Sequence, residues 1–196
     1  MRDLDRDSLL QLFRQSGALL DGHFRLSSGL HSSGYLQCAL VLQDPGVAGT
    51  LGAAVAAQVR ELTPAVVLSP ALGGVIIGHE VARALGVRAL FAERQDGRLA
   101  LRRGFQLAPA ERVLVVEDVI TTGLSTRETM EVARAAGADV VGAAALVDRR
   151  AGHSALGVPF RALLAVELPT WDPATCPLCA RGIEVVKPGS RPAPQP

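Results

Sequence analysis

The feature that most constrains the fold of this chain is the alternation of short apolar segments with segments of helical periodicity. Residues 65–69 (AVVLS), 113–116 (VLVV) and 139–148 (DVVGAAALVD) are nearly uniformly apolar, whereas residues 44–62 and 125–136 have the spacing of helices. A strand that is apolar on both faces must be covered on both faces, as in a parallel sheet flanked by helices. The sequence therefore predicts a doubly wound α/β domain with a mainly parallel sheet, in which ligands bind beyond the carboxyl ends of the strands.

The same pattern predicts the extent of the domain. The strand-like segments RALFAE and LALRRGF flank Asp96-Gly97, a favourable two-residue turn, and indicate an inserted hairpin. Residues 1–187 are enough for a single domain around one core. The Pro-rich residues 188–196 are expected to form a disordered tail.

Charge and cysteine content argue against several classes of function. The formal net charge is +1, and no apolar run approaches the length needed to span a bilayer, so we expect no nucleic-acid partner and no membrane partner. The N-terminal residues include acids and resemble a helix more than a signal peptide. Three cysteines form no disulfide framework, and their odd number fits a reducing compartment, so a cytoplasmic location is expected.

The segment VLVVEDVITTGLS, residues 113–125, carries the clearest chemical signal. It places Glu117 and Asp118 at the end of a buried strand, where two like charges are costly unless hydroxyls, a metal or a developing cation compensate them. The loop Thr121–Ser125 offers three hydroxyls and a glycine before a helix, and a helix N-terminus suits a phosphate. A simpler interpretation, a capping box of Ser125 with the acid three residues later, leaves the paired acids and the threonines unexplained.

This segment resembles, at every position, the phosphoribosyl pyrophosphate (PRPP) signature of type I phosphoribosyltransferases. Neither a Walker loop nor a dinucleotide fingerprint is present. The resemblance implies that the two acids contact the ribose hydroxyls and that the loop binds the 5′-phosphate. It also implies a hairpin lid and a small hood made of N- and C-terminal segments. The PRPP-binding residues so implied are Glu117, Asp118, Val119, Ile120, Thr121, Thr122, Gly123, Leu124 and Ser125.

Three segments are similar to the orotate phosphoribosyltransferases, especially their short, Thermus-type branch. GHFRLSSGLHSSGYL implies possible base contacts from Ser28 and Tyr35, although a flexible Gly/Ser turn has the same composition. LVDRR implies that Arg149 pairs with the orotate carboxylate, for which a planar guanidinium is suited, although a surface arginine at a strand end is common. ITTG implies that Thr121 also touches the base.

The chain departs from that family at three places. The pyrophosphate loop, Ala71, Leu72, Gly73 and Gly74, contains no lysine, although its glycines permit close approach to a diphosphate. Ser27 stands where many of these enzymes have a lysine. The lid carries arginines in place of the usual Arg-Lys, Lys and His, and we expect Arg94, Arg102 and Arg103 to act from it, although they could equally face water on a solvated hairpin.

The resemblance implies transfer of the phosphoribosyl group of PRPP to orotate, giving orotidine 5′-monophosphate and pyrophosphate in pyrimidine (UMP) biosynthesis. Mg²⁺ is the implied cofactor, held by the phosphates of the substrate with no direct protein ligand. A homodimer with shared active sites is implied, with a lid arginine acting in trans. Two alternatives stay open: a phosphoribosyltransferase for a purine or another base, and a non-catalytic nucleotide-sensing regulator on the same fold. A dinucleotide-binding oxidoreductase leaves the paired acids unexplained.

Cys176 and Cys179 form a lone CxxC pair. Structural zinc sites usually show two such pairs, or one pair with two spaced histidines. Cys38 or one of the four histidines could complete a site only through the way in which the chain folds. The sequence therefore favours two small thiols with no metal.

Overall fold

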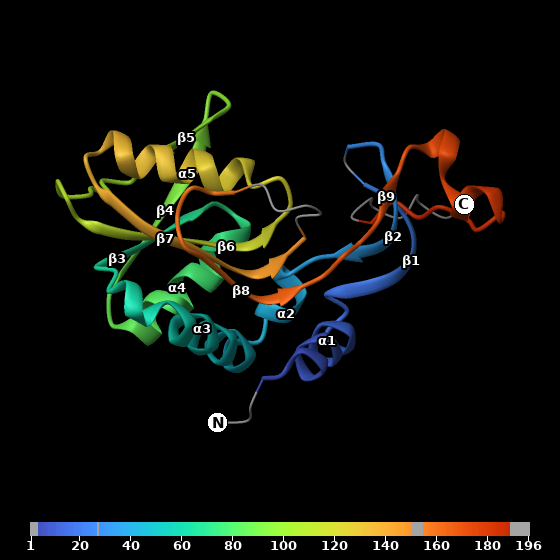
Figure 1. Ribbon diagram of the computed structural model, residues 1–196, viewed down its shortest axis with the longest axis horizontal. Helices are drawn as coiled ribbons and strands as arrows, with labels where there is room; N and C mark the ends of the chain where they lie inside the picture. Colours follow the sequence, from blue (N-terminus) through green and yellow to red (C-terminus); the bar gives the residue numbers. More distant parts are fainter. Residues whose placement is uncertain (1–3, 27, 150–154, 189–196) are drawn as a thin grey trace, which may run out of the picture.

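The computed structural model describes residues 4–26, 28–149 and 155–188. The chain forms a larger α/β body and, beside it, a smaller hood that contains the C-terminal end of the described chain (Figure 1). Apart from Pro188, the tail expected to be disordered lies outside the described residues. None of the helices in the described ranges is long and apolar enough to cross a membrane.

The body is built on a six-stranded sheet in the order β5-β4-β3-β6-β7-β8, in which only β5 is antiparallel to its neighbour. This confirms the predicted doubly wound fold with an inserted hairpin. The strands are β3 (Val66–Pro70), β4 (Arg88–Gln95), β5 (Arg98–Leu101), β6 (Arg112–Ile120), β7 (Asp139–Asp148) and β8 (Phe160–Ala165). The flanking helices are α2 (Ala39–Leu42), α3 (Pro45–Val59), α4 (Gly73–Leu85) and α5 (Leu124–Ala135), with the short η1 (Arg60–Leu62) after α3.

The central strand β6 is apolar from Val113 to Val116 because each of its faces packs there into a separate core. Leu114 and Val116 face the core that contains α3 and α4, whereas Val113 and Val115 face the core beneath α5. All four side chains are fully buried. Burial of one such side chain stabilises the fold by about 1.5–3 kcal/mol, so a polar residue in this run would be costly on either face.

Small residues let the helices on one face pack closely. A Cβ added at Gly52 in α3 would lie 2.5 Å from the Cβ of Glu80 in α4, so no larger residue fits there without a shift. The predicted start of α3 is confirmed, since the carboxylate of Asp44 accepts hydrogen bonds from the N–H groups of Gly46 (2.8 Å) and Val47 (3.0 Å). Pro45 occupies the first helical position, where its missing N–H costs nothing.

The inserted hairpin leaves the sheet at the carboxyl end of β4. Its turn is the predicted one, with Asp96 at φ 51° and Gly97 at φ 81°, a combination that suits a two-residue hairpin. The hairpin projects beyond α5 (Figure 1). Because β3, β4, β6 and β7 are parallel, it arises at the same edge of the sheet as the segment 117–125.

The hood is a three-stranded antiparallel sheet in the order β1-β2-β9. The C-terminal segment lies against β1, where the N–H of Arg25 donates to the carbonyl of Val186 (2.9 Å) and the N–H of Val186 to that of His23 (2.8 Å). Segments from both ends of the chain therefore assemble in one place. The hood elements are β1 (Leu19–Arg25), β2 (His31–Leu36), β9 (Thr170–Trp171), η2 (Pro173–Thr175) and α6 (Pro177–Ala180). The N-terminal helix α1 (Arg6–Gln15) packs Leu9 and Phe13 into the core of the body.

Candidate active site

Glu117 lies at the carboxyl end of β6 and is almost fully buried. The Ser125 hydroxyl donates to Oε1 (2.5 Å), and the Thr126 hydroxyl donates to Oε2. Burial raises the pKa of Glu117, while these two hydroxyls lower it and the neighbouring Asp118 adds to the rise. The compensation that a buried acid requires therefore comes from the first turn of α5.

The alternative interpretation of Ser125 as a helix cap is wrong. Its hydroxyl is used by Glu117, and the N-cap of α5 is Gly123, which makes no side-chain capping bond. Glu128, the acid of the supposed capping box, pairs instead with Arg94 at 2.7 Å. The N-cap itself thus offers no side chain to the first turn of α5, where the N–H of Leu124 donates to the Thr122 hydroxyl (3.3 Å), and a helix start of this kind suits an anion.

Asp118 is half-buried on β6, and its carboxylate lies against the pyrophosphate loop, residues 71–74. A Cβ at Gly73 would lie 2.6 Å from its Oδ1 and 2.7 Å from its Oδ2, so any larger residue there would displace the carboxylate. Burial raises the pKa of Asp118, and backbone N–H groups lower it. The carboxylate lies beside the first residue of α4, at the positive end of that helix.

The pyrophosphate loop is held next to the acids by its own backbone. The N–H of Ala71 donates to the carbonyl of Ala92 (2.8 Å), and Gly74 packs so closely that a Cβ would lie 3.0 Å from the carbonyl oxygen of Val116. Leu72 is 88% exposed. Residues 71–74 and the paired acids therefore meet at the carboxyl edge, as the sequence predicts.

The loop after β6 exposes Thr121 and Thr122 and turns at Gly123, whose φ of 74° favours glycine. The guanidinium of Arg127 donates to the Thr122 carbonyl (2.8 Å), which fixes the loop and places a cation one helical turn from it. Arg127 was not predicted from the sequence, where its only signal is its position four residues after Gly123.

Two residues of the PRPP signature pack in the cores. The Ile120 side chain is fully buried under α5, and Val119 packs against the opposite core. Any contact of these two residues with a ligand would go through their backbone. The Ile120 carbonyl already accepts from the N–H of Arg149 (2.8 Å), which links the end of β6 to the end of β7.

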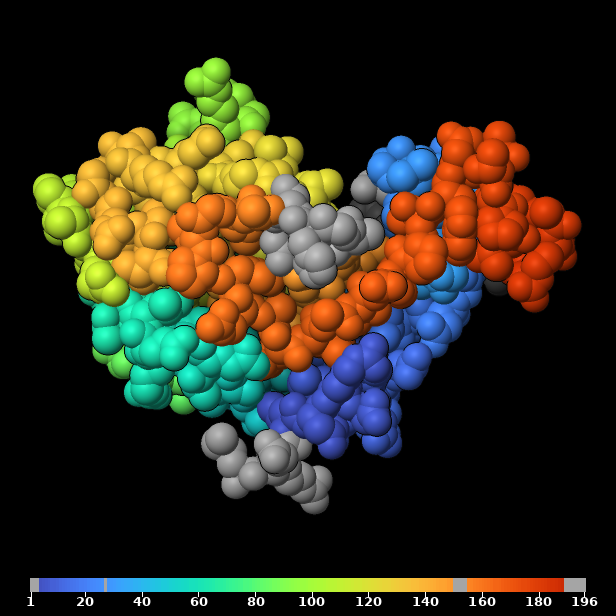
Figure 2. Space-filling model, in the orientation of Figure 1, coloured from blue at the N-terminus to red at the C-terminus, as the bar shows by residue number. Residues whose placement is uncertain are grey.

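A cavity of about 660 Å³ lies between this loop and the hood, where the surface is hollowed (Figure 2). The four residues predicted to contact the base, Ser28, Tyr35, Thr121 and Arg149, all line it, although they come from distant parts of the sequence. The other lining residues are Arg25, Leu26, Leu30, Thr122, Leu168, Thr170, Lys187 and Pro188.

Arg149 is the most unusual of these residues. Its Nε is buried and has no hydrogen-bond partner among the described residues, and burial lowers the pKa of its guanidinium. A buried donor without a partner costs about 1–3 kcal/mol. A planar carboxylate supplied by a ligand could accept one hydrogen bond from Nε and a second, parallel one from a terminal nitrogen of the same guanidinium.

Two cations in the cavity were missed by sequence reasoning. Lys187 is the only lysine of the chain, and Arg25 lies beside it through the pairing of β1 with the C-terminal segment. Lysines that many related enzymes have near Ser28 and in the pyrophosphate loop are missing from this chain. The C-terminal segment brings one lysine into the cavity, which no local pattern could reveal.

The predicted lid arginines do not line this cavity. Arg94 pairs with Glu128 and donates to the Gly97 carbonyl (2.7 Å). Arg103 binds Glu93 through two nitrogens (2.7 and 2.8 Å), and Arg102 is exposed. The structure thus keeps them on the hairpin and does not bring them to the predicted base contacts of the same chain.

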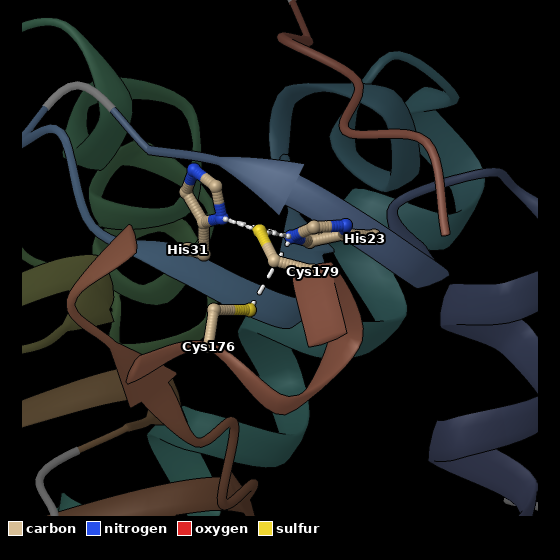
Figure 3. A group of neighbouring side chains, drawn as sticks. All are labelled: His23, His31, Cys176 and Cys179. Carbon is tan, nitrogen blue, oxygen red and sulfur yellow. Dashed lines mark hydrogen bonds between the residues drawn. The ribbon is translucent and has the colours of Figure 1, made fainter. Parts of the chain in front are cut away.

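Cys176 and Cys179, for which the sequence favours two small thiols with no metal, do not lie apart from other potential metal ligands. In the hood these cysteines lie together with His23 and His31, with one ligand atom from each residue within 4.8 Å of all the others. The pairing of β1 with β2 brings the two histidines together, and the C-terminal turn adds the cysteines (Figure 3).

Comparison with known proteins agrees with this geometry. Residues 48–171 match the phosphoribosyl transferase domain family. An orotate phosphoribosyltransferase of Pelotomaculum thermopropionicum is 54% identical over 188 residues, covering 96% of this chain and 99% of that protein. Another, from Novosphingobium aromaticivorans, is 56% identical over 191 residues, covering 96% of this chain and 98% of that protein.

Solved structures show the same fold. Orotate phosphoribosyltransferase from Aeropyrum pernix superposes with a TM-score of 0.65 at 30% identity, covering 81% of this chain and 93% of that chain. The Mycobacterium tuberculosis H37Rv enzyme, crystallised with PRPP, gives a TM-score of 0.63 at 26% identity, covering 82% of this chain and 95% of that chain.

Proposed function

The chain belongs to the phosphoribosyl transferase family and, within it, to the orotate phosphoribosyltransferases, and on that premise we propose how its residues transfer the phosphoribosyl group of PRPP to orotate. The products are orotidine 5′-monophosphate and pyrophosphate. The observation that supports the choice of orotate is Arg149, which lines the cavity beside the phosphate loop and whose buried Nε has no hydrogen-bond partner among the described residues. A ligand carboxylate would pair with its guanidinium.

The carboxyl edge binds PRPP in this proposal. The 5′-phosphate lies at Thr121–Gly123 and the uncapped start of α5, where helix N–H groups and Arg127 favour an anion. Asp118 contacts the ribose hydroxyls. Glu117 already accepts two hydroxyl hydrogen bonds, so it reaches the ribose only with its remaining lone pairs and mainly fixes the first turn of α5.

The reaction replaces pyrophosphate by a nitrogen of the base at C1′ of the ribose, which acquires positive charge in the transition state. The carboxylate of Asp118 stabilises that charge, and the backbone of residues 71–74 receives the departing diphosphate beside it. Arg149 and Thr121 orient the base, while Lys187 and Arg25 add positive charge around an anionic substrate. Leu26, Leu30 and Leu168 reduce the access of water, which would hydrolyse PRPP.

Mg²⁺ fits this site as an ion carried by the substrate. Each oxygen of Glu117 already accepts one hydroxyl hydrogen bond, so Asp118 is the acid better placed to face a hydrated ion. Mg²⁺ prefers one or two carboxylates together with substrate phosphates and several waters. When bound, it would neutralise the leaving pyrophosphate.

The lid arginines support a homodimer with shared sites. Because Arg94, Arg102 and Arg103 do not line the cavity of their own chain, we propose that the hairpin serves the site of a second copy, where Arg102 is available without the loss of an ion pair. A cytoplasmic location is proposed from the free thiols, which fit a reducing compartment.

Pyrophosphate release tests the function directly. The purified chain with Mg²⁺ and PRPP should release pyrophosphate when orotate is added, and not with adenine, hypoxanthine, xanthine or uracil. Orotate fits because its carboxylate can pair with Arg149. Pyrophosphate release with a purine and none with orotate would show that the base substrate is a purine. Binding of PRPP without turnover on any base would favour a non-catalytic regulator.

A further inference from the structure

We propose that His23, His31, Cys176 and Cys179 bind one zinc ion that holds the C-terminal segment in the hood. The four side chains converge from three segments: His23 from β1, His31 from β2, and the cysteines from the turn around α6 (Figure 3). Their ligand atoms all lie within 4.8 Å of one another. None of the four lines the cavity described above, so this site is separate from the proposed substrate site.

The separations suit a tetrahedral ion. Cys176 Sγ lies 3.4 Å and Cys179 Sγ lies 3.8 Å from His23 Nε2. His31 Nδ1 lies 3.3 Å from Cys179 Sγ and 2.9 Å from His23 Nε2. Zinc bonds of about 2.3 Å to sulfur and about 2.0–2.1 Å to nitrogen, at tetrahedral angles, separate the ligands by roughly 3.3–3.8 Å. Small side-chain movements therefore suffice to coordinate zinc.

The second nitrogen of His23 is already oriented for this role. Its Nδ1 lies 2.7 Å from the carbonyl oxygen of Ile183, which can only accept, so Nδ1 carries the proton. The lone pair of Nε2 therefore points into the cluster. Metal-binding histidines are commonly held by such a bond between the other ring nitrogen and a carbonyl.

The donor set favours zinc in a structural role. Two thiolates and two imidazoles form a closed four-ligand set, whereas a catalytic zinc keeps one position open for water. An iron–sulfur cluster typically takes four cysteines, and Mg²⁺ or Ca²⁺ takes oxygen ligands. His23, His31 and Cys176 are buried, whereas Cys179 is exposed and leaves a path for the ion.

The ion would position part of the substrate cavity. The segment after Cys179 carries Ile183, which orients His23, then Val186, which pairs with β1, and then Lys187 in the cavity. The hood has only three short strands, and small units of this kind often need a metal or a disulfide for stability. Zinc would thus fix Lys187 by fastening the chain end that carries it.

Metal content tests the site without any enzyme assay. The full-length chain, purified without a histidine tag, should contain about one zinc per chain by mass spectrometry, and a mercurial that blocks thiols should release it to a colorimetric chelator. Cys179→Ser and His31→Gln should lose the ion. The matched controls Cys38→Ala and His79→Gln should retain it, since Cys38 lies in the body and His79 on the exposed face of α4.

Cobalt provides a readout that needs no variant. Co²⁺ added to the zinc-depleted wild-type chain should give the absorption of a tetrahedral thiolate site at one equivalent, and zinc should abolish it. Three results would each overturn the proposal. They are a metal-free chain that gives no such spectrum, a Cys176–Cys179 disulfide in the freshly purified protein, and a zinc content in Cys179→Ser equal to that of the wild type. Iron or nickel in place of zinc would overturn the identity of the ion.

Discussion

The two sides of the substrate cavity are assembled in opposite ways. On the body side, Glu117, Asp118 and the phosphate loop belong to one continuous segment, positioned by a strand that is buried on both faces. On the hood side, Tyr35, Thr170 and Lys187 come from distant segments that meet only through strand pairing. The ribose and 5′-phosphate contacts are therefore proposed to come from one local segment, whereas the side proposed to bind the base depends on how distant segments of the chain come together.

The largest effect is expected from Asp118→Asn on the body side. The substitution keeps the shape of the side chain and removes the charge proposed to stabilise the ribosyl transition state. Loss of one such electrostatic contact lowers kcat by about 10²–10³-fold. Steady-state pyrophosphate release measures this, and a kcat within a few-fold of wild type would contradict the role of Asp118.

A matched control exists at the other edge of the sheet. Asp139 begins β7 and pairs weakly with Arg112 at 3.7 Å on the surface, far from the carboxyl edge. Asp139→Asn should leave kcat unchanged. A comparable loss in both variants would indicate a general effect on the fold.

Arg149 lies where the two sides meet, and its substitution should rank second. Removal of one partner of a buried charge pair costs about 2–5 kcal/mol, so Arg149→Ala should raise the KM for orotate by at least about 30-fold. The KM for PRPP should change little, because the phosphate loop does not depend on Arg149. An equal rise in the KM for orotate and for PRPP would contradict the assignment of Arg149 to the orotate carboxylate.

Arg149→Lys sharpens the same test. Lysine keeps the charge but has no planar fork for a carboxylate, so it should recover only a small part of the orotate affinity. Full recovery would show that charge alone, without bidentate geometry, accounts for recognition.

The two sides also differ in how far the sequence predicts them. The apolar run of β6, the paired acids and the Asp96-Gly97 turn are local patterns, and the structure places each of them as predicted. The metal cluster depends on contacts such as that between His23 and Cys176, which are 153 residues apart. No periodicity encodes a contact of that kind, and the sequence therefore indicated neither this cluster nor Lys187.

Lys187 tests the hood side, with a smaller expected effect. It is exposed at the cavity rim, so Lys187→Met should raise the KM for orotate or PRPP by about fivefold to tenfold through loss of one charge-assisted contact. Lys187→Arg keeps a cation and should restore most of the affinity. An unchanged KM in Lys187→Met would mean that the C-terminal segment has a structural role in the hood and that Lys187 does not contribute to substrate binding.

The smallest effect concerns the stability of the body side and has a definite sign. Burial raises the pKa of Asp118 from its ordinary value of 3.8, so the folded chain binds this proton more tightly than the unfolded chain. Below both pKa values Asp118 carries no charge and no penalty. As pH rises through the interval between them, the wild type loses stability that Asp118→Asn does not lose.

Urea unfolding of wild type and Asp118→Asn from pH 3.5 to 7.5 measures this difference. The free energy of unfolding of the variant should exceed that of the wild type by an amount that grows with pH and is constant near neutrality. Asp139→Asn should show no such pH-dependent gain, because Asp139 is exposed. If Asp118→Asn is instead increasingly less stable as pH rises, then the charged carboxylate stabilises the fold, through the nearby backbone N–H groups and the start of α4. In that case the charge of Asp118 would not destabilise the body, and its proposed role in the reaction would carry no cost in stability.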